Sequence, residues 1–173
     1  PLGPSGDVAF VFPGSGNHYL GMGRELAAQF PHVLRAQQAE TATLASQLHA
    51  HLFTPQRSDY GPRWREDAAR RIAADNRAMI MGQVAYGALM SDVLSHLGLK
   101  PRAVIGYSLG ETAGLFALRA WRERDEMFRR MQASPLFATE LAGPCDAARR
   151  AWRLGDDESV DWRVVLVNRP ASE

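Results

Sequence analysis

Two short runs of consecutive apolar residues stand out from the pattern of hydrophobic and polar positions. The first covers residues 8–12 (VAFVF) and stops at Pro13 and Gly14, and the second covers residues 103–106 (AVIG). Short, uninterrupted runs of β-branched and aromatic residues are typical of strands that are buried on both faces of a parallel sheet. The pattern therefore predicts two central parallel strands.

Most of the remaining apolar residues recur at helical spacing. Gly98 and Pro101 end the longest of these segments, and further breaks fall at Pro135 and Gly143. Strands that are separated by helices favour a parallel α/β sheet. The segments predicted to be helical are residues 20–30, 31–52, 67–96, 109–118, 125–131 and 147–152.

Changes in composition divide the chain into three parts. Residues 1–6 are rich in proline and glycine and are predicted to be a linker. Residues 7–135 contain both predicted strands and most of the helices, and they form a large α/β subdomain. Further on, a turn at residues 155–158 leads to an apolar run at residues 162–167 that is predicted to be a strand. We expect residues 136–173 to begin a second, smaller subdomain.

The composition is that of an ordinary soluble domain. Of the 173 residues 46% are hydrophobic and 23% are charged, and no apolar run approaches the roughly 18 residues of a membrane span. Cys145 is the single cysteine, which excludes an intramolecular disulfide, and the sequence shows no secretory leader, so we expect a cytoplasmic protein. The 20 basic and 19 acidic residues give a net charge of +1, so nothing in the charge favours a nucleic acid or a membrane as a partner.

The segment Gly106-Tyr107-Ser108-Leu109-Gly110 has the chemistry of a nucleophile elbow. It stands between a predicted strand and a predicted helix, the context that exposes a serine hydroxyl at the edge of a sheet. The glycines permit a sharp turn, and the backbone N–H of Leu109 is the natural first donor to an oxyanion. The plain alternative is that the segment is merely a turn.

A second oxyanion donor must come from another loop at the same edge of the sheet. The loop that follows the first strand, around Ser15, is suitable because Gly14 and Gly16 let its backbone approach a substrate closely. These glycines also suit a plain turn or a phosphate-binding loop. The later glycine and lysine of the nucleotide-binding patterns are absent, so we discount nucleotides.

The two loops together resemble those of the acyltransferase domains of fatty acid and polyketide synthases, which include malonyl-CoA:acyl-carrier-protein transacylase. That family has Pro-Gly-Gln-Gly-x-Gln after an apolar strand and Gly-His-Ser-Leu-Gly-Glu at the nucleophile, where this chain has FVFPGSGNHYLGMG and GYSLGE. The resemblance extends from about Asp7 over essentially the whole chain. The string SLGETAGLFALRAW is most similar to polyunsaturated fatty acid synthases and related iterative polyketide synthases.

The resemblance implies a fold, a reaction and a set of partners. The fold is a hydrolase-like parallel-sheet subdomain with an inserted ferredoxin-like subdomain, of which residues 136–173 are the beginning. In the reaction Ser108 takes an acyl group from acyl-CoA and passes it to the phosphopantetheine thiol of an acyl carrier protein. Neighbouring synthase domains are further implied partners, and neither a bound cofactor nor a metal ion is implied.

The resemblance also assigns site residues, and this chain departs from the family pattern at four of them. Ser15 replaces a glutamine, which need not abolish the oxyanion donor because that donor is a backbone group. Tyr107 replaces a histidine and His18 replaces a glutamine, which changes the pocket wall. Ala133 stands where the family has the arginine that holds a malonyl carboxylate, so we expect an uncharged acyl group to be preferred, or Arg129 or Arg130 to replace the missing arginine. The implied residues are Ser108 as nucleophile, the Leu109 and Ser15 N–H groups as oxyanion donors, and a substrate pocket of His18, Tyr107, Gln83, Arg129, Arg130 and Ala133.

The family's general base is a histidine that follows the small subdomain, beyond Glu173. Of the five histidines present, only His18 is near the predicted site, and none is an obvious substitute. We therefore expect a truncated domain with poor activity. Two alternatives stay open: a serine thioesterase or hydrolase that releases the acyl group to water, and a degenerate, non-catalytic domain that docks a carrier protein.

Overall fold

A computed structural model describes residues 6–56, 61–163, 165 and 167–170. The chain divides into two compact units, Pro1–Ser134 and Pro135–Glu173. The sequence places the corresponding boundary between residues 135 and 136.

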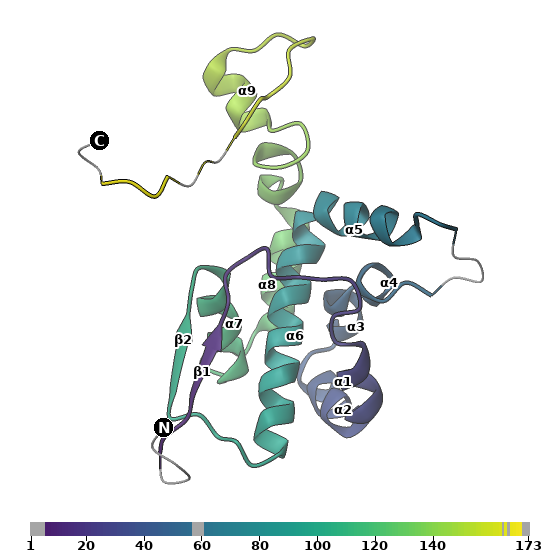
Figure 1. The fold of residues 1–173 in the computed structure, drawn as a ribbon, viewed down its shortest axis with the longest axis vertical. Coiled ribbons are helices and arrows are strands. Elements are labelled where there is room, and N and C mark those ends of the chain that lie inside the picture. Colours follow the sequence, from purple (N-terminus) through teal and green to yellow (C-terminus); the bar gives the residue numbers. More distant parts are fainter. Residues whose placement is uncertain (1–5, 57–60, 164, 166, 171–173) are drawn as a thin grey trace. The chain divides into compact units, whose positions relative to one another are not determined.

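The centre of the first unit is a sheet of two parallel strands, β1 (Ala9–Phe12) and β2 (Ala103–Gly106). Ala9 lies opposite Ala103 and Phe12 lies opposite Gly106, so both strands end at the same edge of the sheet (Figure 1). The predicted pair of parallel strands is confirmed. Because the chain returns to the sheet only after its helices, the ends of β1 and β2 bring together two loops that are far apart in the sequence.

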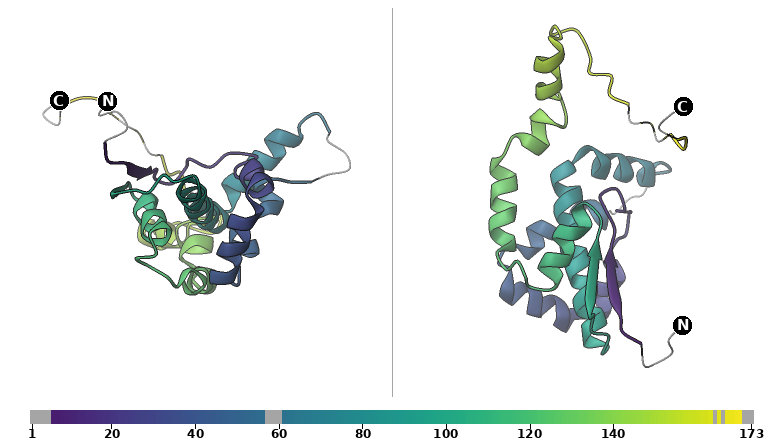
Figure 2. Two further views of the ribbon diagram at one scale, coloured as in Figure 1. Left: turned by 90° about the horizontal axis from the view of Figure 1, so that it is seen from below. Right: turned by 90° about the vertical axis from the view of Figure 1, so that its left-hand side faces the viewer.

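The longest helix, α6, lies between the sheet and a group of smaller helices (Figures 1 and 2). Helix α7 follows β2 directly and packs against α6 and both strands. The helix predicted directly after Ser108, at residues 109–118, is confirmed, and so is the helix predicted at residues 125–131. The helices of this unit are α1 (Arg24–Gln29), α2 (Pro31–Glu40), α3 (Leu44–Leu48), α4 (Ala50–Phe53), α5 (Trp64–Ala74), α6 (Asn76–His96), α7 (Leu109–Ala117) and α8 (Arg124–Ala133).

Two apolar clusters hold the first unit together, one on each side of α6. The sheet-side cluster joins Phe10 and Phe12 of β1 to Val84 and Ala88 of α6 and to α7. The other cluster joins Leu89 and further α6 residues to α1–α5. A helix that is apolar nearly all round is expected to be buried on all sides, and α6 fits that rule.

The outer face of the sheet is not covered by any part of the chain that the structure describes. Val11 is 70% exposed and Ile105 is 58% exposed, whereas Phe10 and Phe12 on the inner face are buried. The prediction that both strands are buried on both faces is therefore wrong for this structure. The sequence pattern records that both faces are apolar, but helices pack on one face only.

Two predicted helices are broken into shorter ones. The segment 31–52 forms α2, α3 and α4, and the segment 67–96 is divided at Asp75. The carboxylate of Asp75 accepts a hydrogen bond from the Ala78 N–H at 2.9 Å, so Asp75 caps the start of α6. The start of α3 is held by a residue that is distant in the sequence: Asp125 accepts hydrogen bonds from the N–H groups of Ala42 and Thr43.

The second unit contains a short π-helix, η2 (Leu136–Glu140), and α9 (Asp146–Trp152). Trp152 stacks on Trp162 with ring centroids 5.9 Å apart. The predicted strand over 162–167 is not formed at residues 162, 163, 165 and 167, and residues 164 and 166 lie outside the described residues. Whether this unit begins a ferredoxin-like subdomain, and whether the first unit is hydrolase-like, stay predictions.

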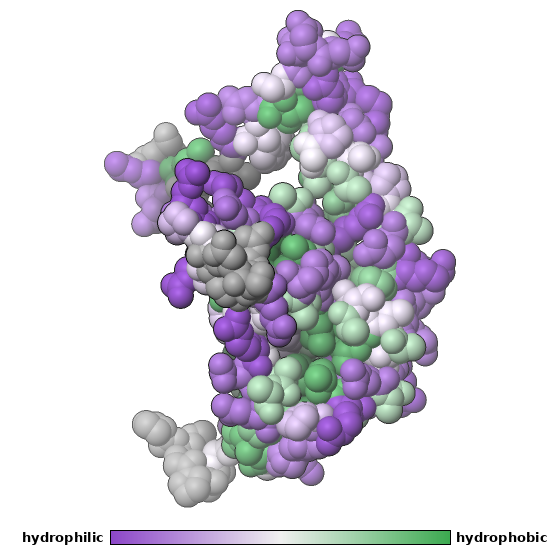
Figure 3. Space-filling view, turned by 90° about the vertical axis from the view of Figure 1, so that its right-hand side faces the viewer, coloured by the Kyte–Doolittle hydropathy of each residue, from purple (hydrophilic) through white to green (hydrophobic). Residues whose placement is uncertain are grey.

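The face of the molecule that carries α1 to α5 is covered mainly by polar side chains, with small apolar areas between them (Figure 3). A surface of this kind is ordinary for a folded domain in water. Within the described residues, no helix has the length and apolar character needed to cross a membrane.

Candidate functional site

Ser108 sits at the turn between β2 and α7 with an unusual backbone conformation. Its φ is 52° and its ψ is −116°, outside the regions that residues with a side chain normally adopt. Such a conformation costs of the order of 1–3 kcal/mol and persists only where the surrounding structure imposes it. The turn directly after β2 thus has the strained geometry that the sequence motif predicts.

The glycines around Ser108 show what imposes this geometry. A Cβ atom on Gly106 would collide with the backbone of Gly110 and Glu111. A Cβ atom on Gly110 would collide with the carbonyl oxygen of Phe12, at the end of β1. The turn is therefore possible only because the backbones of β1, β2 and α7 approach one another without side chains between them.

Several backbone N–H groups of the loops after β1 and β2, among them those of Leu109 and Ser15, have no acceptor among the described residues. At the start of α7 the N–H groups of Gly110 and Glu111 donate to the carbonyls of Tyr107 and Ser108, at 2.9 and 3.0 Å. The N–H of Leu109 makes no such bond, and neither does the N–H of Ser15 in the loop after β1. Both predicted oxyanion donors are thus available to a ligand.

The loop after β1 is held by a side chain from α6. Gln83 is buried, and its amide nitrogen donates to the carbonyl oxygens of Pro13, at 3.2 Å, and Gly14. Asn17 donates to the same Gly14 carbonyl at 2.9 Å. The Tyr107 ring lies so close to Gly14 that a Cβ atom there would be 2.7 Å from it. The two predicted loops therefore touch each other, and Gln83 fixes the position of the first.

An apolar cavity of about 180 Å³ lies beside this loop, between α1, α6 and α7. Its polar side chains are those of Asn17 and Gln83 together with two tyrosines, and the amide oxygen of Gln83 is buried without a partner among the described residues. A small hydrocarbon group fits a space of this size and character. The lining residues are Phe12, Pro13, Asn17, Tyr19, Met22, Gly23, Leu26, Gln83, Tyr86, Gly87, Met90 and Ala113.

None of the histidines makes a hydrogen bond to Ser108 in the described part of the chain. The His18 ring packs edge-on against Phe53, with the centroids 6.5 Å apart, and its Nδ1 is buried without a partner there. Ser108 thus has no histidine hydrogen-bonded to it among these residues. Within the same residues no cluster of three or more metal-ligating side chains is present.

The arginines that are expected to hold a substrate carboxylate are paired with another side chain. On α8, Arg129 makes two 2.7 Å hydrogen bonds to Glu126, and Arg130 makes one of 2.6 Å. The bonds from Arg129 and then Arg130 hold the pKa of Glu126 at about 2, well below its usual value. Glu126 neutralises one of the two arginine charges and occupies the Nε of Arg130, and Ala133 at the end of the same helix offers no charge.

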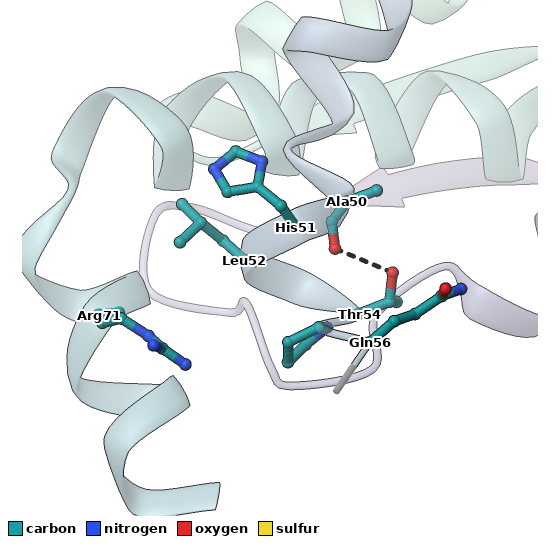
Figure 4. A pocket seen from close by; sticks show the side chains of 7 residues that line it. Ala50, His51, Leu52, Thr54, Gln56 and Arg71 are labelled. Carbon is teal, nitrogen blue, oxygen red and sulfur yellow. Dashed lines mark hydrogen bonds between the residues drawn. The ribbon is translucent and has the colours of Figure 1, made fainter. Parts of the chain in front are cut away.

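A larger hollow, of about 490 Å³, lies between α4 and α5, away from the elbow (Figure 4). Its one hydroxyl, on Thr54, donates to the Ala50 carbonyl at 3.0 Å and is not activated by a base. Nothing in this hollow supports acyl chemistry, so the elbow is the better candidate site. Its lining residues are Ala50, His51, Leu52, Thr54, Pro55, Gln56 and Arg71.

The sequence singled out the turn Gly106–Gly110 as a candidate elbow but not the contacts that hold it. It assigned Gln83 to a substrate pocket through the resemblance, and the structure adds that its amide holds the loop carbonyls. Gln83 is 70 residues from Pro13, so no local pattern links the two. The contact between Tyr107 and Gly14 likewise depends on the register of β1 and β2.

Comparison with known proteins shows homologues among the polyketide synthases. Squalestatin hexaketide synthase of Cochliobolus lunatus is 33% identical over 134 residues, which are 72% of this chain and 5% of that protein. Pikromycin polyketide synthase component PikAIII of Streptomyces venezuelae is 29% identical over 180 residues, 96% of this chain and 10% of that protein. A phenolphthiocerol synthesis polyketide synthase of Mycobacterium marinum is 34% identical over 116 residues, 66% of this chain and 5% of that protein.

The chain therefore spans a tenth or less of the length of these relatives. No protein-family model and no solved structure matches it. Similarity at this level connects the chain to polyketide synthases without assigning it to one of their activities.

Proposed function

We propose that the chain is an acyltransferase domain of a polyketide or fatty acid synthase. It moves an acyl group from acyl-CoA, through an ester on Ser108, to the phosphopantetheine thiol of an acyl carrier protein. The observation that carries the proposal is the strained backbone of Ser108 at the β2–α7 turn, packed between Gly106 and Gly110. Strain of this kind is maintained where it orients a reacting group.

The proposed chemistry has two balanced steps. The Ser108 hydroxyl attacks the thioester carbonyl carbon, its proton goes to a base, the C–S bond breaks, and CoA leaves as a thiol after taking up the proton. The carrier thiol then attacks the new ester, and Ser108 regains its proton. The N–H groups of Leu109 and Ser15 stabilise the oxyanion in both steps. The resemblance assigns the base to a histidine after the small subdomain.

The side chains near the site favour an uncharged acyl group. Ala133 replaces the arginine that the family uses for a carboxylate, and Arg129 and Arg130 are already paired with Glu126. The cavity beside the first loop is lined mainly by apolar residues. No bound cofactor is needed, and acyl-CoA and the carrier protein are the expected partners together with neighbouring synthase domains.

Intact-protein mass measurement after incubation with acetyl-, malonyl- and longer acyl-CoA tests the proposal. We expect a chain that continues past Glu173 as far as the histidine base to gain the mass of one acyl group, with little or no gain from malonyl-CoA, whereas the 173 residues alone should load poorly. Ser108→Ala should gain nothing, whereas Ser46→Ala, a change at an exposed serine of α3, should behave like the wild type. Labelling that persists in Ser108→Ala overturns the assignment of the nucleophile.

One observation favours a second candidate, a non-catalytic domain that docks a carrier protein: no described histidine contacts Ser108. A domain of this kind would bind carrier protein but gain no acyl mass from any acyl-CoA. Free acid that accumulates without carrier protein would instead indicate a thioesterase. The same mass experiment, with the free acid measured in parallel, separates the three functions.

A further inference from the structure

Two histidines from distant parts of the sequence meet on the surface of the first unit. His32 lies in the first turn of α2 and His96 is the last residue of α6, 64 positions later. Their Nε2 atoms are 3.1 Å apart, and both side chains are exposed. The end of α6 lies beside α2 in Figure 1. The fold therefore presents two imidazole nitrogens to solvent at one point.

The arrangement of the rings is not that of a straight hydrogen bond. The ring centroids are 4.3 Å apart and the planes are inclined by 58°. Because the centroids are little farther apart than the nitrogens, the rings lie beside each other instead of end to end. An N–H···N bond is strongest when it is straight, and it uses the lone pair of only one ring.

This arrangement of the two Nε2 atoms suits a shared metal ion better than a hydrogen bond between the rings. Zinc binds imidazole nitrogen at about 2.0–2.1 Å, so two nitrogens 3.1 Å apart subtend an angle of about 100° at the ion. That angle is close to both tetrahedral and octahedral values, and both rings would bind in their neutral forms. The histidines therefore stand at a separation suited to one ion.

The surroundings leave room for the remaining ligands. The Phe30 ring meets both histidines edge-on, at 6.2 Å from His32 and 6.3 Å from His96, and covers the side of the pair that faces the core. No third histidine, cysteine or carboxylate of the described residues completes a cluster. Water would occupy the other coordination positions on the exposed side.

We propose that His32 and His96 bind one divalent transition-metal ion of the kind that prefers imidazole, such as Zn²⁺. The ion links the start of α2 to the end of α6. Because the two ligands meet only in the folded chain, binding stabilises the fold as the metal concentration rises above the dissociation constant. This site is separate from Ser108 and does not depend on the proposed acyl transfer.

The test is titration of the tag-free chain with zinc chloride, followed by calorimetry and by thermal unfolding. We expect one ion to bind per chain and the melting temperature to rise until the site is saturated. His32→Gln and His96→Gln should each weaken binding at least tenfold, because glutamine keeps a hydrogen-bonding side chain but lacks the imidazole ligand. Circular dichroism without metal checks that both variants are folded.

His51→Gln is the matched control, since His51 is an exposed histidine on α4 outside the pair. It should leave the affinity and the melting-temperature shift unchanged. The proposal is overturned if the wild type shows no saturable binding. It is equally overturned if His32→Gln and His96→Gln bind zinc as tightly as the control.

Discussion

Ser108 combines a reactive side chain with a backbone conformation that the polypeptide adopts only under constraint. Its positive φ is maintained by the close approach of Gly110 to the Phe12 carbonyl and of Gly106 to the start of α7. The hydroxyl is thereby held at the amino end of a helix, where partial positive charge favours an oxyanion. The fold thus maintains a local strain at the residue that the proposed chemistry requires.

Replacing Ser108 by glycine should make the chain more stable. Glycine adopts positive φ without strain, and this gain exceeds the entropy that glycine loses on folding, so we expect unfolding to cost about 1 kcal/mol more than in the wild type. Ser108→Ala keeps the strain and should show no such gain. Urea unfolding of the three chains provides the measurement, and equal stability of the glycine and alanine variants would contradict the strain.

Gln83 should matter for acyl loading although it lies outside the elbow. In Gln83→Met the Pro13 carbonyl loses its donor and the Gly14 carbonyl keeps only the bond from Asn17, so the Ser15 N–H is held less firmly in place. Loss of one oxyanion donor costs of the order of 10²-fold in rate, and we expect a drop of at least about tenfold when a donor is only misplaced. Gln38→Met, on the exposed side of α2, is the control for rates measured by mass spectrometry.

Tyr86 gives the chain a sensitivity to alkaline pH. Burial raises the pKa of its phenol to about 12. The unfolded phenol ionises near its usual pKa of about 10, so the stability that Tyr86 contributes is complete below pH 10 and is lost between about pH 10 and 12. We expect Tyr86→Phe to match the wild type at neutral pH and to lose less stability in that window.

Urea midpoints of the wild type and Tyr86→Phe, compared on both sides of about pH 10, measure this difference. Tyr19→Phe is the control, because Tyr19 is 63% exposed. Parallel pH profiles for the wild type and Tyr86→Phe would contradict the role of burial.

At the scale of elements, the sequence predicted what is local and missed what is not. Both strands and the helix after Ser108 were predicted because apolar runs and glycines lie within a few residues of one another. The break between α2 and α3 was not predicted. It is stabilised by hydrogen bonds to Asp125, which follows about 80 residues later in the sequence. The break at Asp75 had a local signal, because this aspartate stands three residues before the N–H that it caps. The strong apolar periodicity of the following helix concealed that signal.

Asp75→Ala should destabilise the start of α6 by about 1 kcal/mol, because the Ala78 N–H loses its acceptor. Asp75→Asn retains a capping oxygen and should cost much less. Urea unfolding measures both changes. An asparagine variant as unstable as the alanine variant would mean that the charge, and not the cap, is what stabilises the helix.

At the scale of the first unit, a polar network links several helices in addition to the two apolar clusters. Asp92 on α6 accepts two hydrogen bonds from Arg119, at 2.7 and 2.8 Å, and one from Gln37 at 2.6 Å. Gln37 in turn accepts a bond from the buried Arg124 at 3.2 Å. The network connects α2, α6, the segment between α7 and α8, and the first residue of α8, and no sequence pattern predicts it because its members come from four separate regions.

Asp92→Ala should destabilise the unit by about 1–2 kcal/mol, since Arg119 and Gln37 lose their shared acceptor in a partly buried position, while Arg119 keeps Glu40 and the Ala117 carbonyl. Asp67→Ala is the matched control: its pair with Arg70 is exposed and contributes about 0–1 kcal/mol. Urea unfolding of both variants tests the contrast. Similar losses of unfolding free energy in the two variants would show that Asp92 contributes no more stability than an exposed ion pair.

The strained backbone at Ser108 also has an evolutionary consequence. In a lineage that kept this domain only for docking, the hydroxyl would be dispensable, and mutation to glycine would be favoured by the stability that it adds. Under the proposed reaction, serine at this position is maintained by selection for acyl transfer, against the preference of the fold. Homologues that have lost acyl transfer are expected to carry glycine at the position of Ser108 more often than any other replacement.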